Sequence, residues 1–402
     1  MTPLFLTSFT ATSCLGTGLR AMSAALHNTH TGLAPCRFED VELDTWIGAV
    51  PEIEHAALPV RWQRFECRNN RLALLGLGQD NFMAAVADCV SRVGAHRVGL
   101  FLGTSTSGIL QTELAYRNRD SESGALPASF HYAGSHNAFS AAILARELLG
   151  IQGPTAVVST ACSSSAKAFG SAQRMIELGI IDAAVVGGVD SLCLTTLYGF
   201  HSLQLTARRP CRPFAADRDG ISIGEAAAFV LLEKSPARNC ESAIALLGVG
   251  ESNDGYHLSS PHPQGLGARL AMQAALSAAG LEAAAVGYIN LHGTGTTSND
   301  SAECTAVTSV FGATVPCSST KGATGHTLGA AGALEAVICA LALRDQLIPG
   351  APNTGPLDPT LELNYCTHSA PQPISYALSN SFGFGGTNCS LVFGRLPLGA
   401  AP

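Results

Sequence analysis

Cys162 is the residue of this sequence best placed to act as a nucleophile. It follows the β-rich run 155–158 directly, within the stretch Ser-Thr-Ala-Cys-Ser-Ser-Ser of residues 159–165, and it opens a helical pattern that ends near Gly179. A cysteine in that position faces the positive end of the helix dipole, which favours the thiolate. We therefore expect a reactive sulfur at the junction of a strand and a helix.

Three further segments contain residue types that do chemistry. His292-Gly-Thr-Gly-Thr-Thr stands at a predicted strand end, Lys321 and His326 share the stretch 318–327, and a Gly-rich loop follows Asn380. Each has an ordinary structural interpretation, because a lone histidine after a strand is more often structural than catalytic and a Gly-rich loop is more often a tight turn. A buried cysteine is likewise usually a small apolar residue. Only their joint occurrence argues for a catalytic site.

The composition indicates a large, tightly packed α/β protein. The chain has 402 residues, of which 13% are charged and 47% hydrophobic, and it contains 42 glycines. That length suggests two subdomains or a duplicated fold rather than one small core. The formal net charge of -7 gives no general attraction to nucleic acid or to an anionic membrane, so an acidic partner would have to meet a local basic patch.

The thirteen cysteines are scattered singly, and none forms a CxxC pair. This odd number and spacing indicate neither a disulfide framework nor a zinc site, so we expect a reducing, cytoplasmic environment and no bound metal. The first residues lack the basic segment of a signal peptide. The apolar run 333–343 contains Glu335, so we do not expect it to span a bilayer.

Predicted strands alternate with predicted helices, which is typical of a sheet covered on both faces. A second cycle of the same kind begins after residue 241, and the connection 234–241 suggests halves of residues 1–240 and 241–402. The duplication is inferred from element order alone, since no repeat of identical residues is visible. The expected strands are 97–103, 183–188, 226–233, 246–250 and 286–291, and the expected helices are 137–149, ended by Gly150, and 266–279, capped by Gly280.

Together these segments resemble the β-ketoacyl-acyl carrier protein synthases, the elongating condensing enzymes of the thiolase superfamily. The resemblance covers roughly residues 95–395, whereas the first 90 residues match poorly. The motifs that carry it are Thr160-Ala-Cys-Ser-Ser, Asp182-Ala-Ala-Val-Val-Gly-Gly, Arg212-Pro-Phe-Ala-Ala-Asp-Arg-Asp-Gly, His292-Gly-Thr-Gly-Thr, Lys321-Gly-Ala-Thr-Gly-His and Phe382-Gly-Phe-Gly-Gly-Thr-Asn.

The resemblance implies a thiolase-like, five-layered αβαβα fold with two pseudo-duplicated halves, the nucleophile coming from the first and both histidines from the second. It also implies a β-ketoacyl synthase, an acyltransferase that joins malonyl units to an acyl group on Cys162 by decarboxylative Claisen condensation. The pathway would be fatty acid, or specialised polyketide or polyene, biosynthesis. His292 and His326 would hold the enolate, and no metal or redox cofactor is required.

The remaining site residues follow from the same resemblance. The backbone N–H groups of Cys162 and Phe384 would form an oxyanion hole, with Gly383 and Gly385 allowing close approach. Lys321 would support the histidines electrostatically, and Glu335 would be its partner. Asp300 and Glu303 could anchor the His292 loop, although a solvated helix start is an alternative.

Substrate contacts are expected on two segments. Four hydroxyl residues near the site would bind substrate, the serines by hydrogen-bonding the pantetheine arm: Ser259, Ser260, Thr294 and Thr296. Ser135 and His136 match the far end of the acyl pocket, where housekeeping enzymes tend to carry aliphatic residues. Their polarity suggests a substrate less plain than a saturated fatty chain, such as a polyunsaturated, aryl-capped or otherwise polar acyl group.

The expected partner is an acyl carrier protein, acyl- or malonyl-loaded, which is acidic and needs a cationic rim. Candidates for carrier docking are Arg64, Arg68, Arg71, Arg208 and Arg209, with the alternative that these arginines pair with nearby acids such as Glu66. Partnership in a homodimer, or in a heterodimer with a related ketosynthase-like subunit, is also expected.

Two interpretations from different classes stay open at this point. The first is the elongating synthase, which two histidines distinguish from initiating Cys-His-Asn synthases and from thiolases that use a second cysteine. The second is a non-elongating partner subunit of a heterodimeric ketosynthase, similar to a chain-length factor. Cys162 favours the first, because a chain-length factor lacks the reactive cysteine.

Overall fold

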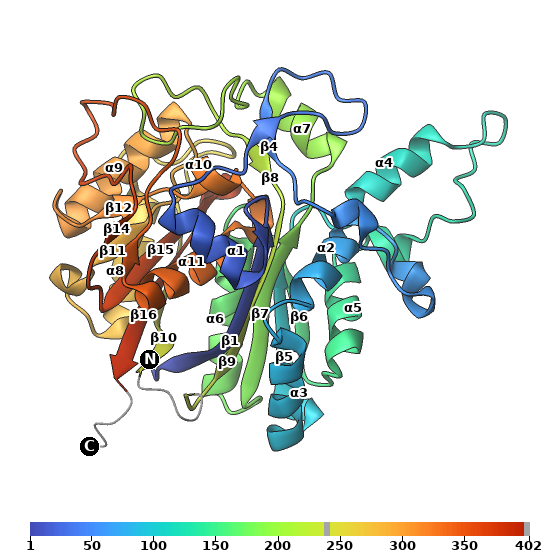
Figure 1. The fold of residues 1–402 in the computed structure, drawn as a ribbon, viewed down its shortest axis with the longest axis horizontal. Coiled ribbons are helices and arrows are strands. Elements are labelled where there is room, and N and C mark those ends of the chain that lie inside the picture. The colour runs from blue at the N-terminus through green and yellow to red at the C-terminus, as the bar shows by residue number, and fades with distance from the viewer. Residues whose placement is uncertain (237–241, 398–402) are drawn as a thin grey trace.

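Strands from both ends of the chain meet in one large mixed sheet (Figure 1). The computed structural model describes residues 1–236 and 242–397. The first half supplies neighbouring strands in the order β1-β9-β7-β5-β6, and the second supplies β10-β16-β15-β11-β12. Their bounds are β1 Leu4–Ser13, β5 Val98–Gly103, β6 Thr155–Val158, β7 Ala183–Asp190, β9 Ala226–Glu233, β10 Ser242–Asn253, β11 Tyr288–Asn290, β12 Cys317–Ser318, β15 Tyr376–Gly383 and β16 Thr387–Pro397.

The two sets of strands share one topology. We number the five strands of each set by their order in the chain. The first strand pairs antiparallel with the fifth, and the fifth pairs antiparallel with the fourth. The second strand pairs in parallel with both the third and the fourth. A short antiparallel pairing of Leu4 and Phe5 with Leu246 and Ala245 joins the sets. This repetition confirms the two pseudo-duplicated halves. The boundary predicted between residues 240 and 241 lies outside the described residues and stays a prediction.

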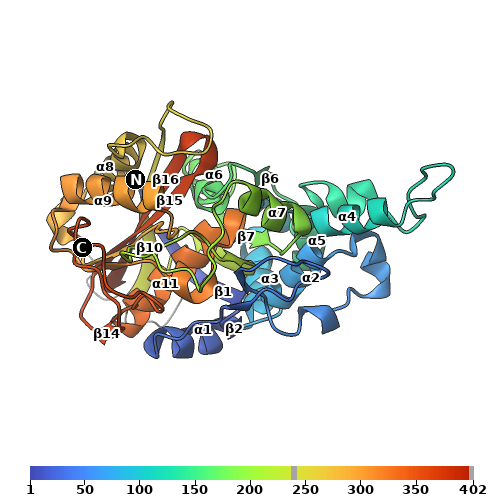
Figure 2. The same ribbon diagram turned by 90° about the horizontal axis from the view of Figure 1, so that it is seen from above.

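Helices complete five layers (Figure 2). Two helices lie between the sets of strands, α6 (Ser164–Glu177) and α11 (Ala331–Asp345). Three cover the outer face of the first set, α2 (Arg68–Leu77), α3 (Phe82–Val93) and α5 (Ser140–Leu149). On the outer face of the second set, α8 (Leu266–Ala279) packs on the strands and α9 (Thr297–Phe311) packs on α8.

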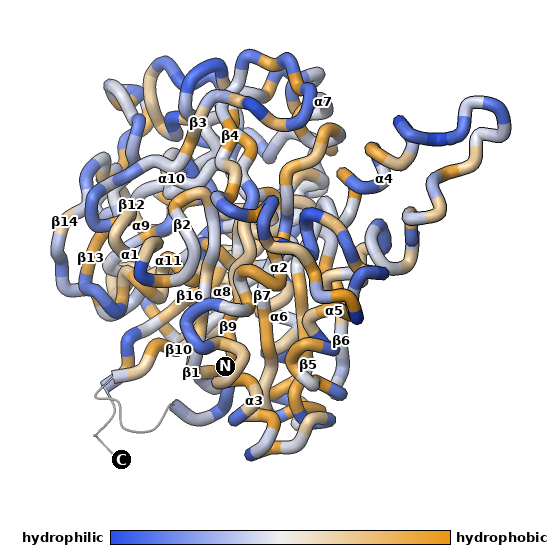
Figure 3. Tube along the Cα trace, turned by 45° about the vertical axis from the view of Figure 1, so that its right-hand side comes forward, coloured by the Kyte–Doolittle hydropathy of each residue, from blue (hydrophilic) through white to orange (hydrophobic). Residues whose placement is uncertain are grey.

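The strand β9 shows why the sequence reads as a continuous apolar run. Its alternate residues pack into different cores: Ala226, Ala228 and Val230 face the central helices, whereas Ala227 and Phe229 face the outer helices, Ala227 against α2 and Phe229 against α2 and α3. A strand buried on both faces has no solvent side, so it needs no alternation of polar residues. Figure 3 shows apolar residues concentrated along such strands and along the central helices.

The elements expected at 226–233 and 266–279 form with those bounds, and Gly280 ends α8 with a φ of +66°. The helix expected from residue 137 begins instead at Ser140, as α5, because the Asn137 side chain accepts a hydrogen bond from Phe139 N and forms a turn there. None of the helices formed by residues 1–236 and 242–397 combines the length and apolar character needed to cross a bilayer.

The remaining elements are short or lie at the periphery. The helices are α1 (Gly18–His27), α4 (Ile109–Arg117), α7 (Leu194–Ser202) and α10 (Lys321–Thr324), and the strands are β2 (Gly16–Thr17), β3 (Ala34–Pro35), β4 (Trp46–Gly48), β8 (Ile223–Gly224), β13 (Leu347–Ile348) and β14 (Ala370–Pro371). Of these, α10 and β8 hold residues of the predicted site: α10 begins with Lys321, and β8 pairs with the backbone of His326. The helix α10 precedes the loop that leads into the buried helix α11, and His326 lies in that loop.

Candidate active site

Cys162 lies in a sharp turn between β6 and α6. Ala161 adopts a left-handed φ of +53°, which turns the chain so that Cys162 lies two residues before the helix begins. Ser164 stabilises this turn by accepting a hydrogen bond from Thr160 N at 2.9 Å. Cys162 is 6% exposed, and Phe384 of the Gly-rich loop lines the same pocket. The predicted nucleophile is thus held at the base of a pocket.

His326 faces the sulfur through its Nε2 atom, which lies 3.0 Å from Cys162 Sγ. The His326 backbone is fixed by β8 through hydrogen bonds to Ser222 O and from Gly224 N. Its Nδ1 atom accepts a hydrogen bond from Leu328 N at 3.2 Å. Because a backbone N–H can only donate, Nδ1 carries no proton in the neutral ring and Nε2 carries it. His326 therefore presents an N–H donor to the pocket.

His292 enters the same pocket from the carboxyl end of β11. Glu303 of α9 accepts hydrogen bonds from His292 N and Gly293 N at 2.8 and 2.7 Å, which fixes the loop. Lys321 Nζ lies 3.4 Å from His292 Nδ1. An ammonium group has no acceptor, so Nδ1 accepts and Nε2 carries the proton. The His292 and His326 rings lie 5.3 Å apart between centroids at 84°.

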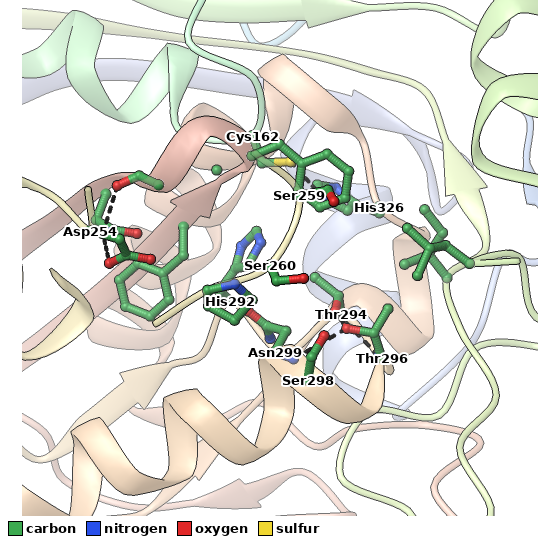
Figure 4. Close-up of a pocket in the computed structure, with 18 of the residues that line it drawn as sticks. Cys162, Asp254, Ser259, Ser260, His292, Thr294, Thr296, Ser298, Asn299 and His326 are labelled. Atoms are coloured by element: carbon green, nitrogen blue, oxygen red, sulfur yellow. Dashed lines mark hydrogen bonds between the residues drawn. The ribbon is translucent and has the colours of Figure 1, made fainter. Parts of the chain in front are cut away.

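Three reactive atoms therefore converge from both halves of the fold. The Cys162 sulfur and one ring nitrogen from each of His292 and His326 lie within 4.8 Å of one another, and all three side chains are buried (Figure 4). Burial, and then the charge of Lys321, holds the pKa of both imidazoles well below its ordinary value. Both rings are consequently neutral near pH 7. A neutral imidazole can donate a hydrogen bond to a developing anion without losing its proton to that anion.

Lys321 and Glu335 form a buried ion pair behind the histidines. Lys321 is the first residue of α10, and Glu335 projects from α11, a helix whose residues 331–343 are all buried. Burial raises the pKa of Glu335, and the Lys321 ammonium opposes that rise. The pairing expected between these two residues is thus present, and it holds a positive charge beside His292.

The expectation of a resting thiolate at Cys162 is wrong. Burial raises the pKa of the Cys162 thiol to about 11, whereas the Lys321 charge and the Phe384 N–H oppose the rise. The helix dipole favours the anion, but the loss of hydration in a buried site is the larger effect here. The structure therefore favours a protonated thiol that must lose its proton during the reaction.

Asp300 and Glu303 are buried at the start of α9, so the alternative of a solvated helix start is wrong. Asp300 accepts hydrogen bonds from Phe214 N at 2.9 Å and Gly295 N at 3.2 Å. Burial raises the pKa of Glu303 to about 7, against the opposing hydrogen bonds from the His292 loop. Both carboxyl groups anchor the loop that carries His292.

The predicted substrate-binding hydroxyl groups surround the reactive atoms. Ser259, Ser260, Thr294 and Thr296 line the same pocket as Cys162, and Figure 4 shows Ser259 near Cys162 and His326 and Ser260 near His292. Gly383 lines it as well, whereas Gly385 lies beside it in the loop and donates its N–H to Leu258 O. The apolar part of the wall includes Phe382 and Phe384 of the Gly-rich motif. It also includes three residues that sequence reasoning missed: Phe200, Leu205 and Ile221.

Ser135 and His136 lie apart from this pocket. They belong to a single five-residue turn, Tyr132–His136, in which Ser135 Oγ donates to His131 O at 2.8 Å. His136 Nδ1 lies 2.6 Å from Thr112 Oγ1 of α4. Neither residue is among those lining the Cys162 pocket in the described chain, so their part in substrate binding stays a prediction.

The five arginines expected to bind a carrier do not share one surface. Arg64 belongs to a 3-10 turn that ends at Phe65, and Arg68 begins α2 after a break, so their spacing does not place them on one helix face. Arg68 is buried against Glu225, with its guanidinium 2.7 Å from Oε1. The other four reach the surface at least in part; Arg64, Arg71 and Arg209 form ion pairs, with Glu147, Glu66 and Asp217.

Asp190, at the carboxyl end of β7, is a buried polar residue that sequence reasoning did not single out. Its position was a usable signal, because polar residues at the carboxyl ends of parallel strands are often functional. Leu328 was also missed, since it acts through its backbone N–H and its side chain gives no sign of that.

Comparison with known proteins assigns the same regions. Residues 84–237 match the sequence profile of the beta-ketoacyl synthase N-terminal domain, and residues 244–354 match that of the C-terminal domain. The 3-oxoacyl-[acyl-carrier-protein] synthase 2 of Rhizobium meliloti is 42% identical over 260 residues, which cover 61% of this chain and 62% of that protein. The enzyme of the same name from Staphylococcus aureus is 33% identical over 312 residues, 74% and 77% of the two chains.

Solved structures agree over nearly the whole chain. One is a chain from the complex between the ketosynthase ApeO and its chain length factor ApeC of Xenorhabdus doucetiae, with a TM-score of 0.88, 37% identity and 98% coverage of both chains. Another is a beta-ketoacyl synthase from Burkholderia phymatum, with a TM-score of 0.83, 28% identity, and coverage of 98% of this chain and 100% of the other. By sequence, the matched part spans less than two thirds of the Rhizobium meliloti relative.

Proposed function

This chain belongs to the beta-ketoacyl synthase family, and we propose from that membership and from the site that it catalyses decarboxylative Claisen condensation. Malonyl-loaded carrier protein would react with an acyl group held on Cys162, in fatty acid or specialised polyketide or polyene biosynthesis. One observation carries the proposal. The Cys162 sulfur and two neutral imidazoles lie within 4.8 Å of one another in one buried pocket.

The first half-reaction loads the acyl group. The Cys162 sulfur attacks the thioester carbonyl of an acyl carrier, the bond from that carbonyl carbon to the pantetheine sulfur breaks, and the proton of the Cys162 thiol leaves on the pantetheine sulfur. The N–H groups of Cys162 and Phe384 would hold the oxyanion; Phe384 supports this role because it lines the pocket that contains Cys162. Loss of one such donor costs about 3 kcal/mol in the transition state.

The second half-reaction forms the carbon–carbon bond. The malonyl carboxylate leaves as carbon dioxide, and the electron pair of the broken bond passes into the thioester carbonyl to give an enolate. The enolate oxygen accepts hydrogen bonds from the Nε2–H groups of His292 and His326. The enolate carbon attacks the acyl carbonyl on Cys162, the bond from that carbonyl carbon to the Cys162 sulfur breaks, and the sulfur leaves as a thiolate that takes up a proton from water. Lys321 and Leu328 N hold the two Nδ1 atoms, so that both donors point into the pocket.

The carrier protein binds, in this proposal, at exposed arginines. Arg208 and Arg209 support it because they follow Leu205 and Thr206, close to the pocket wall, and Arg208 is exposed with no ion pair among the described residues. Arg64 and Arg71 form a second, separate candidate patch. Arg68 is buried and forms an ion pair with Glu225, so it does not reach the surface itself. Its proposed role in docking is therefore indirect: it holds the position of α2.

We also propose a dimeric assembly, with a second copy or a ketosynthase-like partner. The outer strand β6 supports it, because the sheet pairs it only with β5 among the described residues and all four of its residues are partly exposed. Solved relatives include a ketosynthase in complex with its chain length factor. Ser135 and His136 keep their proposed role near the far end of the acyl pocket, selecting a polar or polyunsaturated chain.

A panel assay tests these proposals together. The protein is incubated with malonyl-carrier and with saturated, aryl-capped or polyunsaturated acyl-carriers, and products are measured by mass. We expect β-ketoacyl products two carbons longer than the primer, with the saturated primers poorest. The variant Cys162→Gln should release carbon dioxide without condensing. If condensation needs a related subunit and persists when Cys162→Gln replaces the parent chain in that pair, the chain-length-factor alternative would be favoured.

A further inference from the structure

Asp190 joins the loop after β5 to the loop that follows His326. It stands at the carboxyl end of β7, and its side chain is fully buried. One oxygen accepts hydrogen bonds from Thr104 Oγ1, from Ser105 N, and from both the backbone N–H and the hydroxyl of Thr106, at 2.7 to 2.9 Å. The other oxygen accepts hydrogen bonds from Gly329 N at 2.6 Å and, shared with the first oxygen, from Ser105 N at 3.0 Å.

No cation pairs with Asp190 in residues 1–236 and 242–397, so these N–H and O–H donors alone satisfy the carboxylate. A buried carboxylate without a cation is costly unless such donors compensate it. A neutral aspartate would also lack one acceptor for this arrangement. The grouping of five donors therefore indicates a carboxylate retained for position, since an apolar residue would fill β7 at lower cost.

The neighbouring residue connects this anchor to the catalytic histidine. Leu328 precedes Gly329 and adopts a left-handed φ of +52°, which is unfavourable for a branched aliphatic residue. In that conformation its N–H donates to His326 Nδ1 at 3.2 Å. The hydrogen bond from Gly329 N to Asp190 stands next in the chain and opposes relaxation of Leu328 to an ordinary φ.

We infer that Asp190 is a positioning residue for His326: by holding Gly329 it keeps Leu328 N–H on Nδ1 and so fixes the tautomer whose Nε2–H faces Cys162. The inference rests on the proposed condensation for its effect on rate, but not for its effect on the ring. In Asp190→Asn, if the amide oxygen stays with the Thr104 and Thr106 donors, the amide NH2 faces Gly329 N–H, and the contact becomes repulsive.

The test compares Asp190→Asn with Asp80→Asn. Asp80 also accepts a threonine hydroxyl, from Thr10, and a backbone N–H, from Leu19, but it lies outside the pocket. We expect Asp190→Asn to lower kcat for malonyl-carrier decarboxylation by about 10- to 100-fold, the effect of losing an outer partner of an active-site group, with KM unchanged. Asp80→Asn should leave both constants unchanged.

A second readout does not depend on activity. Nitrogen NMR of histidine-labelled protein should show His326 protonated only at Nε2 in the unsubstituted protein and in Asp80→Asn, and a mixture of tautomers in Asp190→Asn. If Asp190→Asn does not fold, Thr104→Val removes one donor with little change of shape and should shift the same signal in the same direction. Unchanged His326 signals in the folded variants would overturn the inference, even if the protein proves not to condense anything.

Discussion

Lys321→Met removes the ammonium group that contacts both Glu335 and His292. The Lys321 side chain is 1% exposed and that of Glu335 is 2% exposed, so solvent cannot replace the lost partner. Removing one member of a buried ion pair costs about 3–5 kcal/mol because the other charge is left uncompensated. We expect the free energy of unfolding, measured by denaturant titration, to fall by that amount.

The same change should reduce decarboxylation. Without the ammonium, His292 Nδ1 loses its donor, the ring is no longer held with Nε2–H in the pocket, and the positive charge near the enolate is gone. We expect the rate of carbon dioxide release from malonyl-carrier to fall by about 100-fold, the order found when one oxyanion donor is removed.

The double variant Lys321→Met with Glu335→Gln separates the two effects. It removes both charges, and replacing a whole buried pair is often nearly neutral for stability, so most of the lost unfolding free energy should return. Decarboxylation should stay low, because the catalytic charge is still missing. If the double variant recovered decarboxylation together with stability, the assignment of Lys321 to the chemistry would be refuted. A single variant with unchanged stability would refute the buried-pair reasoning.

Four other perturbations have defined outcomes. Burial raises the pKa of Cys162 to about 11, so the ionised fraction of the thiol should rise about tenfold per pH unit from about pH 7 to 10. The rate of alkylation by iodoacetamide, followed by peptide mass mapping, should rise in parallel. A rate that reaches a plateau below about pH 9 would contradict this. Glu303→Gln should cost about 1–3 kcal/mol of stability and slow decarboxylation, since it disrupts the N–H contacts of the His292 loop; equal values for variant and parent in both measurements would exclude the anchoring role. Arg208→Glu should raise KM for carrier at low salt and leave kcat unchanged. Arg68→Ala should lower the free energy of unfolding by about 3 kcal/mol, because it leaves the buried Glu225 without its cation. If Arg68→Ala raised KM for carrier and Arg208→Glu did not, the docking site would lie at α2 instead.

Much of the fold was predictable from local patterns. The helix α8 and the strand β9 have the predicted bounds because glycine capping and an unbroken apolar run are local signals. The strand β1 was not predicted, although it is central in the sheet and lies between β9 and β10. Its two neighbours in the main sheet order, β9 and β10, lie more than 200 residues away in the chain, and no local pattern in the first 90 residues reveals them.

The site was predictable as a set of residues but less so as an electrostatic environment. The motifs identify Cys162, His292 and His326, and the fold brings them together. The protonation state of Cys162 was predicted wrongly because the helix dipole is visible in the sequence, whereas the burial that outweighs it depends on tertiary packing. The interior position of Arg68 escaped for the same reason, since its partner Glu225 is 157 residues away.

The most direct test of the account is to observe the acyl group on Cys162. The protein is incubated with an acyl-carrier alone, digested and analysed by mass spectrometry, and malonyl-carrier is then added to a parallel sample. We predict an acyl increment confined to the peptide that contains Cys162, lost on addition of malonyl-carrier as a β-ketoacyl product two carbons longer appears. An increment on a different cysteine peptide, or condensation without any increment on Cys162, would contradict the proposed mechanism.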